Sequence, residues 1–179
     1  MDPDSCLLRW TELCNGITVM PLSLGAAFAL LLALMLLYTS GFVSASEIAF
    51  FSLSPSDLND IEEENHPSDS KIKALLEDSE RLLATILISN NFVNVTIIML
   101  LNYVFASVID FGEAKILEFL IVTVVLTFLL LLFGEIMPKI YSAQHTLPFA
   151  RKAAPVVTVL RTVFWHVMKN FIWLLTKVL

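Results

Sequence analysis

The chain has 179 residues, of which 57% are hydrophobic and only 16% are charged, against about 25% charged residues in an ordinary soluble domain. A globule of this size could not bury so much apolar surface, so the composition indicates a membrane protein and nearly excludes a soluble one. The net charge of −6 and the absence of a Lys/Arg cluster with interleaved aromatics argue against nucleic acid as a partner.

The N-terminal segment, residues 1–20, is polar and is expected to lie outside the cytoplasm. It holds both cysteines, Cys6 and Cys14, and neither has a second cysteine or a histidine at metal-site spacing. A disulfide in an oxidising compartment and two unpaired thiols fit the sequence equally well. The acidic opening, residues 1–4, is unlike the basic start of a secretory signal, so we expect the following apolar tract to be retained.

Three apolar tracts are candidates to cross a bilayer, which requires about 20 apolar residues per helix. They cover about 21–51, 82–109 and 119–134, and Ile116 and Leu117 extend the third at its start. The sequence therefore predicts an all-α membrane protein with three crossings. An odd number of crossings places the two ends of the chain on opposite sides.

Residues 54–81 separate the first two tracts and indicate a polar helical hairpin. Ser54-Pro55-Ser56-Asp57 is typical of a helix start, and His66-Pro67-Ser68-Asp69 of a turn followed by a second capped helix. The acidic run 62–64 is most simply a solvated face, with contact to a cation or partner as the alternative. The link between the second and third tracts, 110–114, is short and contains a glycine.

The distribution of Lys and Arg predicts the orientation. Only Arg9 and Lys115 lie on the side of the N-terminus, so we expect the N-terminus outside and the hairpin and C-terminus in the cytoplasm. The basic residues on the expected cytoplasmic side are Lys71, Lys73, Arg81, Lys139, Arg151, Lys152, Arg161, Lys169 and Lys177.

The last segment, residues 147–179, is amphipathic. Arg161, Lys169 and Lys177 recur every eight residues, with Trp165 beside them. A cationic stripe of this kind favours a juxtamembrane helix lying in the cytoplasmic interface over a fourth crossing. Its apolar side could equally pack on the three crossings.

Polar residues within the apolar tracts carry the functional information, because an unpaired polar group is costly in hydrocarbon. They form three groups, late in the first tract, early to middle in the second and at the end of the third. Antiparallel packing of the tracts brings all three groups to the inner half of the bilayer. The groups are Ser40, Gly41, Ser44, Ser46 and Glu47; Ser89, Asn90, Asn91 and Asn94; and Gly134, Glu135, Pro138 and Lys139.

Spacing within the first two groups points to one cavity. Ser40 and Ser44 are four residues apart, as are Asn90 and Asn94, so each pair shares a helix face. Any one of these residues could instead make an interhelical hydrogen bond worth about 1 kcal/mol. The coincidence of three groups at one depth favours a common site.

A proline adds a backbone oxygen to the set. In an α-helix Pro138 cannot donate to the carbonyl of Gly134, which is thereby freed beside the Glu135 carboxylate. Hard oxygen donors of this kind suit Mg²⁺ or another hard cation and argue against zinc or copper. The expected metal ligands are Ser40, Ser44, Asn90, Asn94, the Gly134 carbonyl and Glu135, with Gly41, Pro138 and Glu47 as structural support.

Two of the charged residues also have plainer explanations. Glu135 lies four residues before Lys139, and the two could form an ordinary interfacial ion pair. Glu47 could extend its carboxylate to the inner interface.

Three motifs occur in order: SGFVSASE at 40–47, SNNFVN at 89–94 and GEIMPK at 134–139. On these motifs the chain, over roughly residues 22–179, resembles the transmembrane domain of the CNNM/CorC magnesium transporters. The resemblance implies a homodimer in the bacterial inner membrane, with three membrane helices per subunit, a cytoplasmic helical hairpin and a juxtamembrane belt helix. It implies Mg²⁺ transport, Na⁺-coupled export in some members, and an ion site on the same six residues.

The resemblance has one departure and two further implications. Ser89 stands where relatives commonly have Gly, so packing at the second motif is expected to differ. Family members usually continue into paired CBS domains that bind nucleotide, and nucleotide is expected only through such domains, which are absent from this chain. The opening residues are also similar to the gliding-motility-associated branch of the family from Bacteroidota.

We therefore expect a divalent-cation transporter that exports Mg²⁺ by alternating access. The alternative is a cation-sensing or scaffolding module, for example in a gliding-motility assembly, that binds Mg²⁺ without moving it. No nucleophile with its base is evident in the sequence, so an enzyme is not expected.

Overall fold

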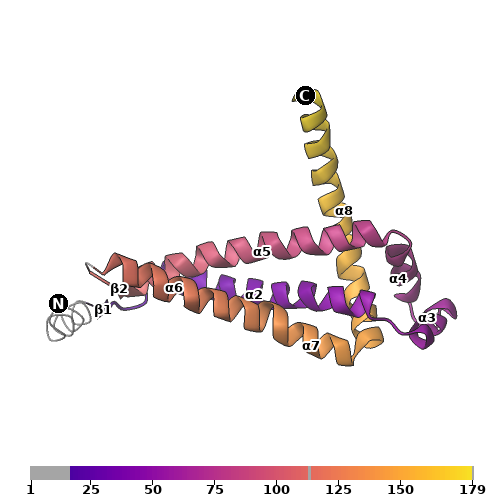
Figure 1. The fold of residues 1–179 in the computed structure, drawn as a ribbon, viewed down its shortest axis with the longest axis horizontal. Helices are drawn as coiled ribbons and strands as arrows, with labels where there is room; N and C mark the ends of the chain where they lie inside the picture. Colours follow the sequence, from indigo (N-terminus) through magenta and orange to yellow (C-terminus); the bar gives the residue numbers. More distant parts are fainter. Residues whose placement is uncertain (1–16, 113, 179) are drawn as a thin grey trace, which may run out of the picture.

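Three long helices lie side by side in the computed structural model, which describes residues 17–112 and 114–178, with side chains described as far as residue 165 (Figure 1). α2 (Leu24–Phe51) and α5 (Ser79–Val108) are continuous, and the third helix spans Lys115–Gln144. All three are long and apolar enough to cross a membrane. The predicted all-α membrane protein with three crossings is confirmed. The cysteines of the N-terminal segment lie outside the described residues.

The third long helix is composite. It consists of α6 (Lys115–Leu129), a π-helical segment η1 (Leu130–Ile136) and α7 (Met137–Gln144). It therefore extends well past the end predicted near residue 134. A π-helix places an extra residue in each turn, and such segments are found frequently at functional sites.

The two predicted short helices are present between the first two long ones. α3 (Pro55–Glu62) begins with a capping box, in which Ser54 and Asp57 bond to each other's backbone N–H. α4 (Asp69–Leu76) follows the predicted turn, and the Asp69 carboxylate accepts from the His66 N–H at 3.0 Å. Local capping chemistry thus defines the hairpin.

At the opposite end of the bundle the structure adds a feature that was not predicted. β1 (Thr18–Val19) pairs antiparallel with β2 (Ile109–Asp110), with Val19 opposite Ile109. Gly112 in the following link adopts a positive φ of 54°, and its N–H donates to Asp110 Oδ1 at 2.9 Å. This small ribbon ties the start of the described chain to the link between α5 and α6.

α8 (Thr146–Val178) contains the predicted amphipathic segment, and its first part runs across the long helices rather than alongside them (Figure 1). Its small residues face the bundle: Ala150, Ala153, Ala154 and Val157 are fully buried. Among the described residues, α8 does not qualify as a membrane span. Its placement in the membrane interface stays a prediction, and the side chains of Lys169 and Lys177 lie outside the described part.

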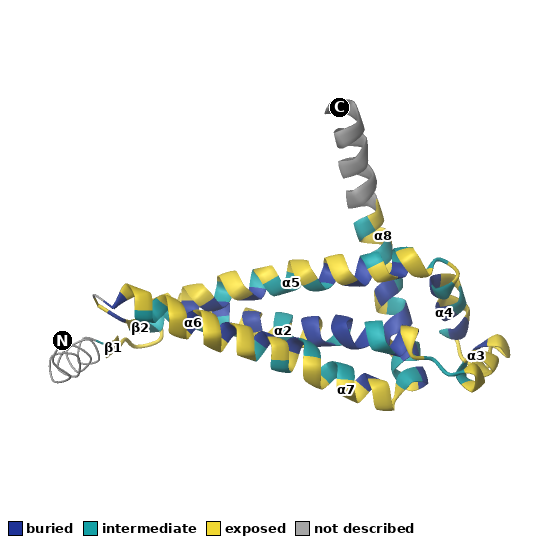
Figure 2. Ribbon diagram, in the orientation of Figure 1, coloured by how far each residue is buried: buried dark blue, intermediate teal, exposed yellow. Residues whose placement is uncertain are grey.

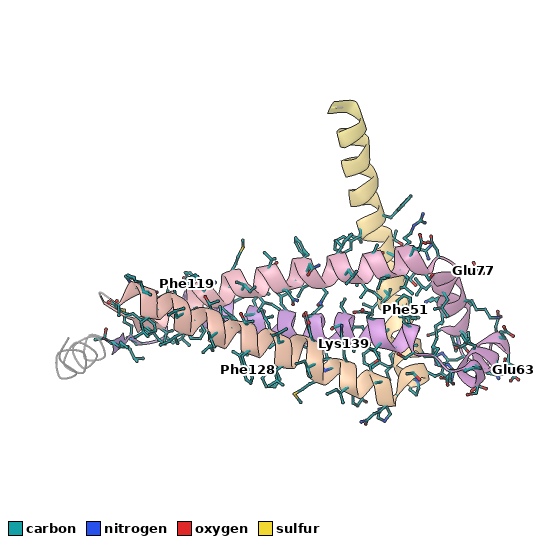
Figure 3. The ribbon with its side chains drawn as sticks, viewed as in Figure 1. Phe51, Glu63, Glu77, Phe119, Phe128 and Lys139 are labelled. Carbon is teal, nitrogen blue, oxygen red and sulfur yellow. The ribbon has the colours of Figure 1, made fainter. Side chains whose placement is uncertain are left out.

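Burial is concentrated toward the hairpin end (Figure 2). One apolar core joins the C-terminal end of α2 and the N-terminal end of α5 to α3, α4 and α8, through residues such as Phe50, Ile72 and Leu82. A second core fills the middle of the three long helices around Ala33, Ile97 and Leu126. Figure 3 shows Phe119 and Phe128 projecting outward from α6, where they are exposed as lipid-facing side chains are.

The hairpin is fastened to α8 by a buried ion pair. Arg151 donates to both carboxylate oxygens of Asp69, at 2.8 and 3.0 Å, and the Asp69 side chain is fully buried. This hydrogen bonding holds the pKa of Asp69 below its usual range, although burial acts in the opposite direction. The lowered pKa means that folding favours the ionised carboxylate, so the pair stabilises the fold above about pH 4 and loses that contribution as the pH falls further.

We expect Asp69→Asn to lower the free energy of unfolding by about 3 kcal/mol at pH 7, because it leaves the half-buried Arg151 without its counter-charge. Thermal or denaturant unfolding in detergent measures this loss. The variant should also lack part of the wild-type decline in stability below about pH 4. Glu64→Gln is the matched control: it breaks the exposed Lys73–Glu64 pair and should cost less than about 1 kcal/mol. Equal losses in the two variants would contradict the role assigned to Asp69.

Candidate metal site

α2 is the central helix of the bundle, and the half of it nearer the hairpin is enclosed. It contacts α5, η1, α7 and α8, and Ser40, Gly41 and Ser44 are all buried there. Small side chains let membrane helices approach closely. A Cβ on Gly41 would lie 2.9 Å from Pro138 Cγ and 3.1 Å from the Phe133 carbonyl oxygen, so this contact between α2 and the third helix requires glycine.

Three of the predicted ligands meet at Ser40. Its hydroxyl lies 2.8 Å from Asn90 Oδ1 and 2.6 Å from Asn94 Oδ1, and it is fully buried. The i, i+4 spacing of the two asparagines places both amides on the face of α5 that meets α2. The Ser40 hydroxyl has one proton, so it can satisfy only one of these amide oxygens fully.

Ser44 lies one turn further along α2. Its side chain is only 1% exposed, and its hydroxyl has no hydrogen-bond partner within the described part of the chain. A buried hydroxyl without a partner costs roughly 1–3 kcal/mol. A buried hydroxyl of this kind can store strain or bond to a water or an ion.

Gly134 is brought against the same cluster from the third helix. A Cβ at this position would lie 3.3 Å from Ser40 Oγ. At the end of the π segment the N–H of Met137 bonds to the carbonyl of Leu132, five residues earlier. Pro138, which follows in α7, has no N–H to donate to an earlier carbonyl. The Gly134 carbonyl as a metal ligand stays a prediction.

Glu135 follows directly and is half-buried. Within the described residues it makes no hydrogen bond or ion pair, so the ordinary pairing with Lys139 is not formed. Lys139 instead contacts Glu47 of α2, with 3.1 Å between Nζ and Oε2. Glu47 is thus a partner of the third helix, and Glu135 is left with its charge unpaired.

The remaining polar residues of the motifs do not join the cluster. Ser46 donates to the Phe42 carbonyl and Ser89 to the Thr85 carbonyl, each at 2.7 Å within its own helix. Asn91 is exposed. The Ser89 hydroxyl is therefore satisfied by a local bond on α5.

One interhelical contact was missed from the sequence. Ser142 of α7 is fully buried and donates to the Ala45 carbonyl of α2 at 2.7 Å. Its only sequence signal is its position one turn after Pro138 and Lys139. The Ser142–Ala45 hydrogen bond joins α7 to α2 beside the Glu47–Lys139 ion pair.

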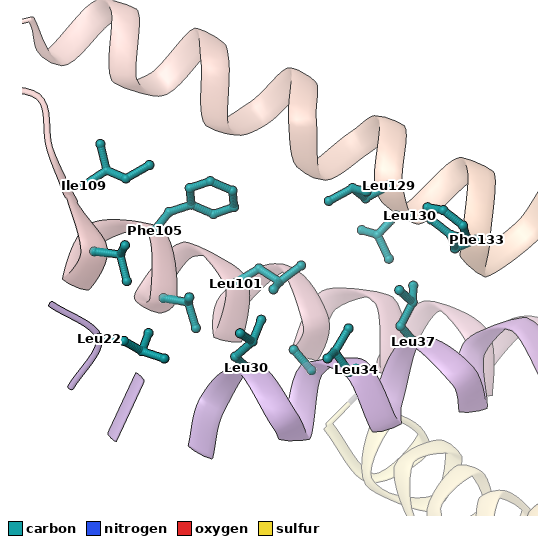
Figure 4. A pocket seen from close by; sticks show the side chains of 13 residues that line it. Leu22, Leu30, Leu34, Leu37, Leu101, Phe105, Ile109, Leu129, Leu130 and Phe133 are labelled. Carbon is teal, nitrogen blue, oxygen red and sulfur yellow. The ribbon is translucent and has the colours of Figure 1, made fainter. Parts of the chain in front are cut away.

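An apolar cavity of about 520 Å³ lies between α2, α5 and the third helix (Figure 4). It begins near Leu22 and Ile109 and extends to Leu37, Leu130 and Phe133. Leu37 and Leu130 also lie near Gly134. The oxygen cluster is thus bordered on the β1–β2 side by a space lined with hydrocarbon side chains.

Three apolar helices around a buried group of hydroxyl and amide oxygens define a polytopic membrane domain with a polar centre. The comparison with protein families agrees: the cyclin M transmembrane N-terminal domain (CNNM) matches residues 31–179. The chain belongs to the CNNM family.

Similar proteins occur in bacteria and animals. The chain is 29% identical to a UPF0053 protein of Haemophilus influenzae over 81% of its length, 32% identical to the metal transporter cnnm-4 of Caenorhabditis elegans over 70%, and 28% identical to the UPF0053 inner membrane protein YfjD of Escherichia coli over 70%. These matches cover 32%, 27% and 29% of the relatives. The chain therefore spans less than a third of the length of the curated relatives it matches.

Gly41→Ala should destabilise the protein, because the new methyl group meets a proline ring and a backbone carbonyl, neither of which can move freely. We expect a loss of about 1–3 kcal/mol, as for other overpacked sites, measured by thermal unfolding in detergent. Gly25→Ala is the control: its Cβ would lie 3.1 Å from the hydroxyl at the end of the Tyr103 side chain, which can turn away. Similar stability of the two variants would show that the α2 contact is looser than described.

Proposed function

We propose that this domain binds a hard divalent cation, Mg²⁺ in the first place, and carries it across the membrane. The observation that supports this most directly is that Ser40 Oγ lies 2.8 Å from Asn90 Oδ1 and 2.6 Å from Asn94 Oδ1. Neutral oxygens so close together are mutually repulsive unless a proton or a cation lies between them. Only one proton is available from the hydroxyl.

A cation bound by these three oxygens would take the place of the missing proton. Turning one amide would present its NH₂ group to Ser40 and satisfy the contact without an ion, so the arrangement with both amide oxygens inward is the one that suits a bound metal. The unpartnered hydroxyl of Ser44 offers a further oxygen. Mg²⁺ prefers such oxygen ligands and retains several waters.

Glu135 is the proposed source of negative charge. It is half-buried and unpaired among the described residues, and it follows Gly134, which lies beside Ser40. A site with one carboxylate and several neutral oxygens binds Mg²⁺ with moderate affinity, because affinity grows with ligand charge. A carrier needs moderate affinity, since it must release the ion.

Alternating access is the proposed mode of transport. The apolar cavity beyond the cluster offers no ligand to an ion, so movement toward the β1–β2 end requires the helices to repack. The π segment and the glycine contact at Gly41 mark the place where α2 and the third helix could shift. No covalent chemistry is needed.

The direction of transport, the use of Na⁺ and the homodimer belong to the same proposal. With basic residues concentrated on α4, α7 and the first part of α8, we infer a cytoplasmic hairpin and an external β1–β2 end. Export would then run from the cluster toward the apolar cavity. The exposed apolar faces of α5 and α6 are available to lipid or to a second subunit.

Mg²⁺ should raise the thermal unfolding midpoint of the purified protein. At a concentration about 100 times the dissociation constant the stabilisation is about 2.7 kcal/mol. Asn90→Ala and Glu135→Gln each remove a proposed ligand and should abolish most of this shift. Ser89→Ala, which removes only a bond within α5, should keep it. If both ligand variants are stabilised as much as wild type, the assigned site is wrong.

Transport itself is tested in proteoliposomes loaded with a magnesium-sensitive dye. Wild-type protein should move Mg²⁺ down an imposed gradient, and Glu135→Ala should reduce the flux to that of protein-free vesicles. Ser46→Ala serves as the control, because its hydroxyl bonds only to its own helix. Tight binding with no flux in wild-type vesicles would replace the transporter with a cation-sensing module.

A further inference from the structure

The sequence of the third helix does not predict the ion-pair partner that Lys139 has in the structure. A glutamate four residues before a lysine is the favoured order for an ion pair on a helix surface, and Glu135 occupies that position. Lys139 nevertheless contacts Glu47 of α2, at 3.1 Å, with the two side chains 34% and 27% exposed. Glu47 therefore takes up the lysine that Glu135 would otherwise attract.

The consequence for a cation site is electrostatic. An ammonium group on a flexible four-carbon stem can reach any carboxylate within a helical turn. Paired with Glu135, it would cancel the one negative charge of the candidate site and repel an incoming divalent ion. Charges a few ångströms apart near a protein surface interact strongly enough to change the affinity for an ion, so the partner of Lys139 affects the candidate site.

We propose that Glu47 is a positioning residue that holds Lys139 away from Glu135 and so keeps the Glu135 carboxylate available to the transported cation. This inference rests on the proposed function, because it assumes that Glu135 faces the ion. Glu47 itself need not touch the ion. Ser142, which ties α7 to α2 beside the pair, keeps Lys139 within reach of Glu47.

A purely structural ion pair between α2 and α7 would behave differently. If the pair only joined the helices, removing either partner would weaken the fold, and removing both would not restore ion binding. If Glu47 restrains Lys139, removing Glu47 frees a competing cation, whereas removing Lys139 does not. The two single variants are then expected to have opposite effects on affinity.

The experiment measures the Mg²⁺ dissociation constant of purified protein by calorimetric titration. Glu47→Gln should bind Mg²⁺ roughly tenfold more weakly than wild type, a size set by the pairwise charge interaction after screening by water. Lys139→Gln should bind as tightly as wild type or more tightly. The double variant Glu47→Gln/Lys139→Gln should return to within about threefold of wild type, because the competing ammonium is absent.

Glu118→Gln is the matched control, since Glu118 pairs with Lys115 at the far end of the bundle and is also 27% exposed. It should leave the dissociation constant unchanged. Unaltered affinity in Glu47→Gln, or equal weakening in the single Glu47 variant and the double variant, overturns the proposal. If Glu47→Gln does not fold, weaker binding by Lys139→Gln alone overturns it. No Mg²⁺ binding by wild type would instead refute the proposed function.

Discussion

One constraint applies to the half of α2 nearer the hairpin: polar oxygens enclosed between membrane helices must form their hydrogen bonds inside the bundle. The Ser40 hydroxyl has one proton for two amide oxygens, and the Ser44 hydroxyl has no hydrogen-bond partner among the residues that the structure describes. Buried polar atoms with incomplete hydrogen bonding are costly away from water. This incomplete hydrogen bonding is also the basis of the proposed cation site. The close packing of α2 against α5 and the third helix keeps these oxygens together.

The rest of the fold serves to hold that packing. The hairpin and the first part of α8 form an apolar core with the C-terminal end of α2 and the N-terminal end of α5, and the Asp69–Arg151 pair fastens them together. The π segment places Gly134 beside Ser40, while Gly41 admits the ring of Pro138. On the β1–β2 side of the cluster, hydrocarbon side chains line the apolar cavity. Rigid support on one side and a π segment on the other are compatible with a site that opens by helix movement.

Much of this architecture can be predicted from the amino-acid sequence. Apolar length predicts the three crossings, and capping residues predict α3 and α4, because both signals depend on neighbours in sequence. The four-residue spacing of Ser40 with Ser44, and of Asn90 with Asn94, predicts shared helix faces for the same reason. The contact of Ser40 with both asparagines follows once the two helices pack antiparallel at matching depth. The participation of Glu135 remains a prediction.

Other features could not be read from local patterns. The β1–β2 ribbon consists of two-residue strands, too short for a hydrophobic period to reveal. The π register, the Ser142 bond and the pairing of Lys139 with Glu47 all depend on how α2 and the third helix are rotated against each other. Residues alone determined the spans, the hairpin and the kinds of oxygen available. Tertiary packing decided which of those groups meet, because a hydrogen bond or ion pair between helices requires particular facing atoms.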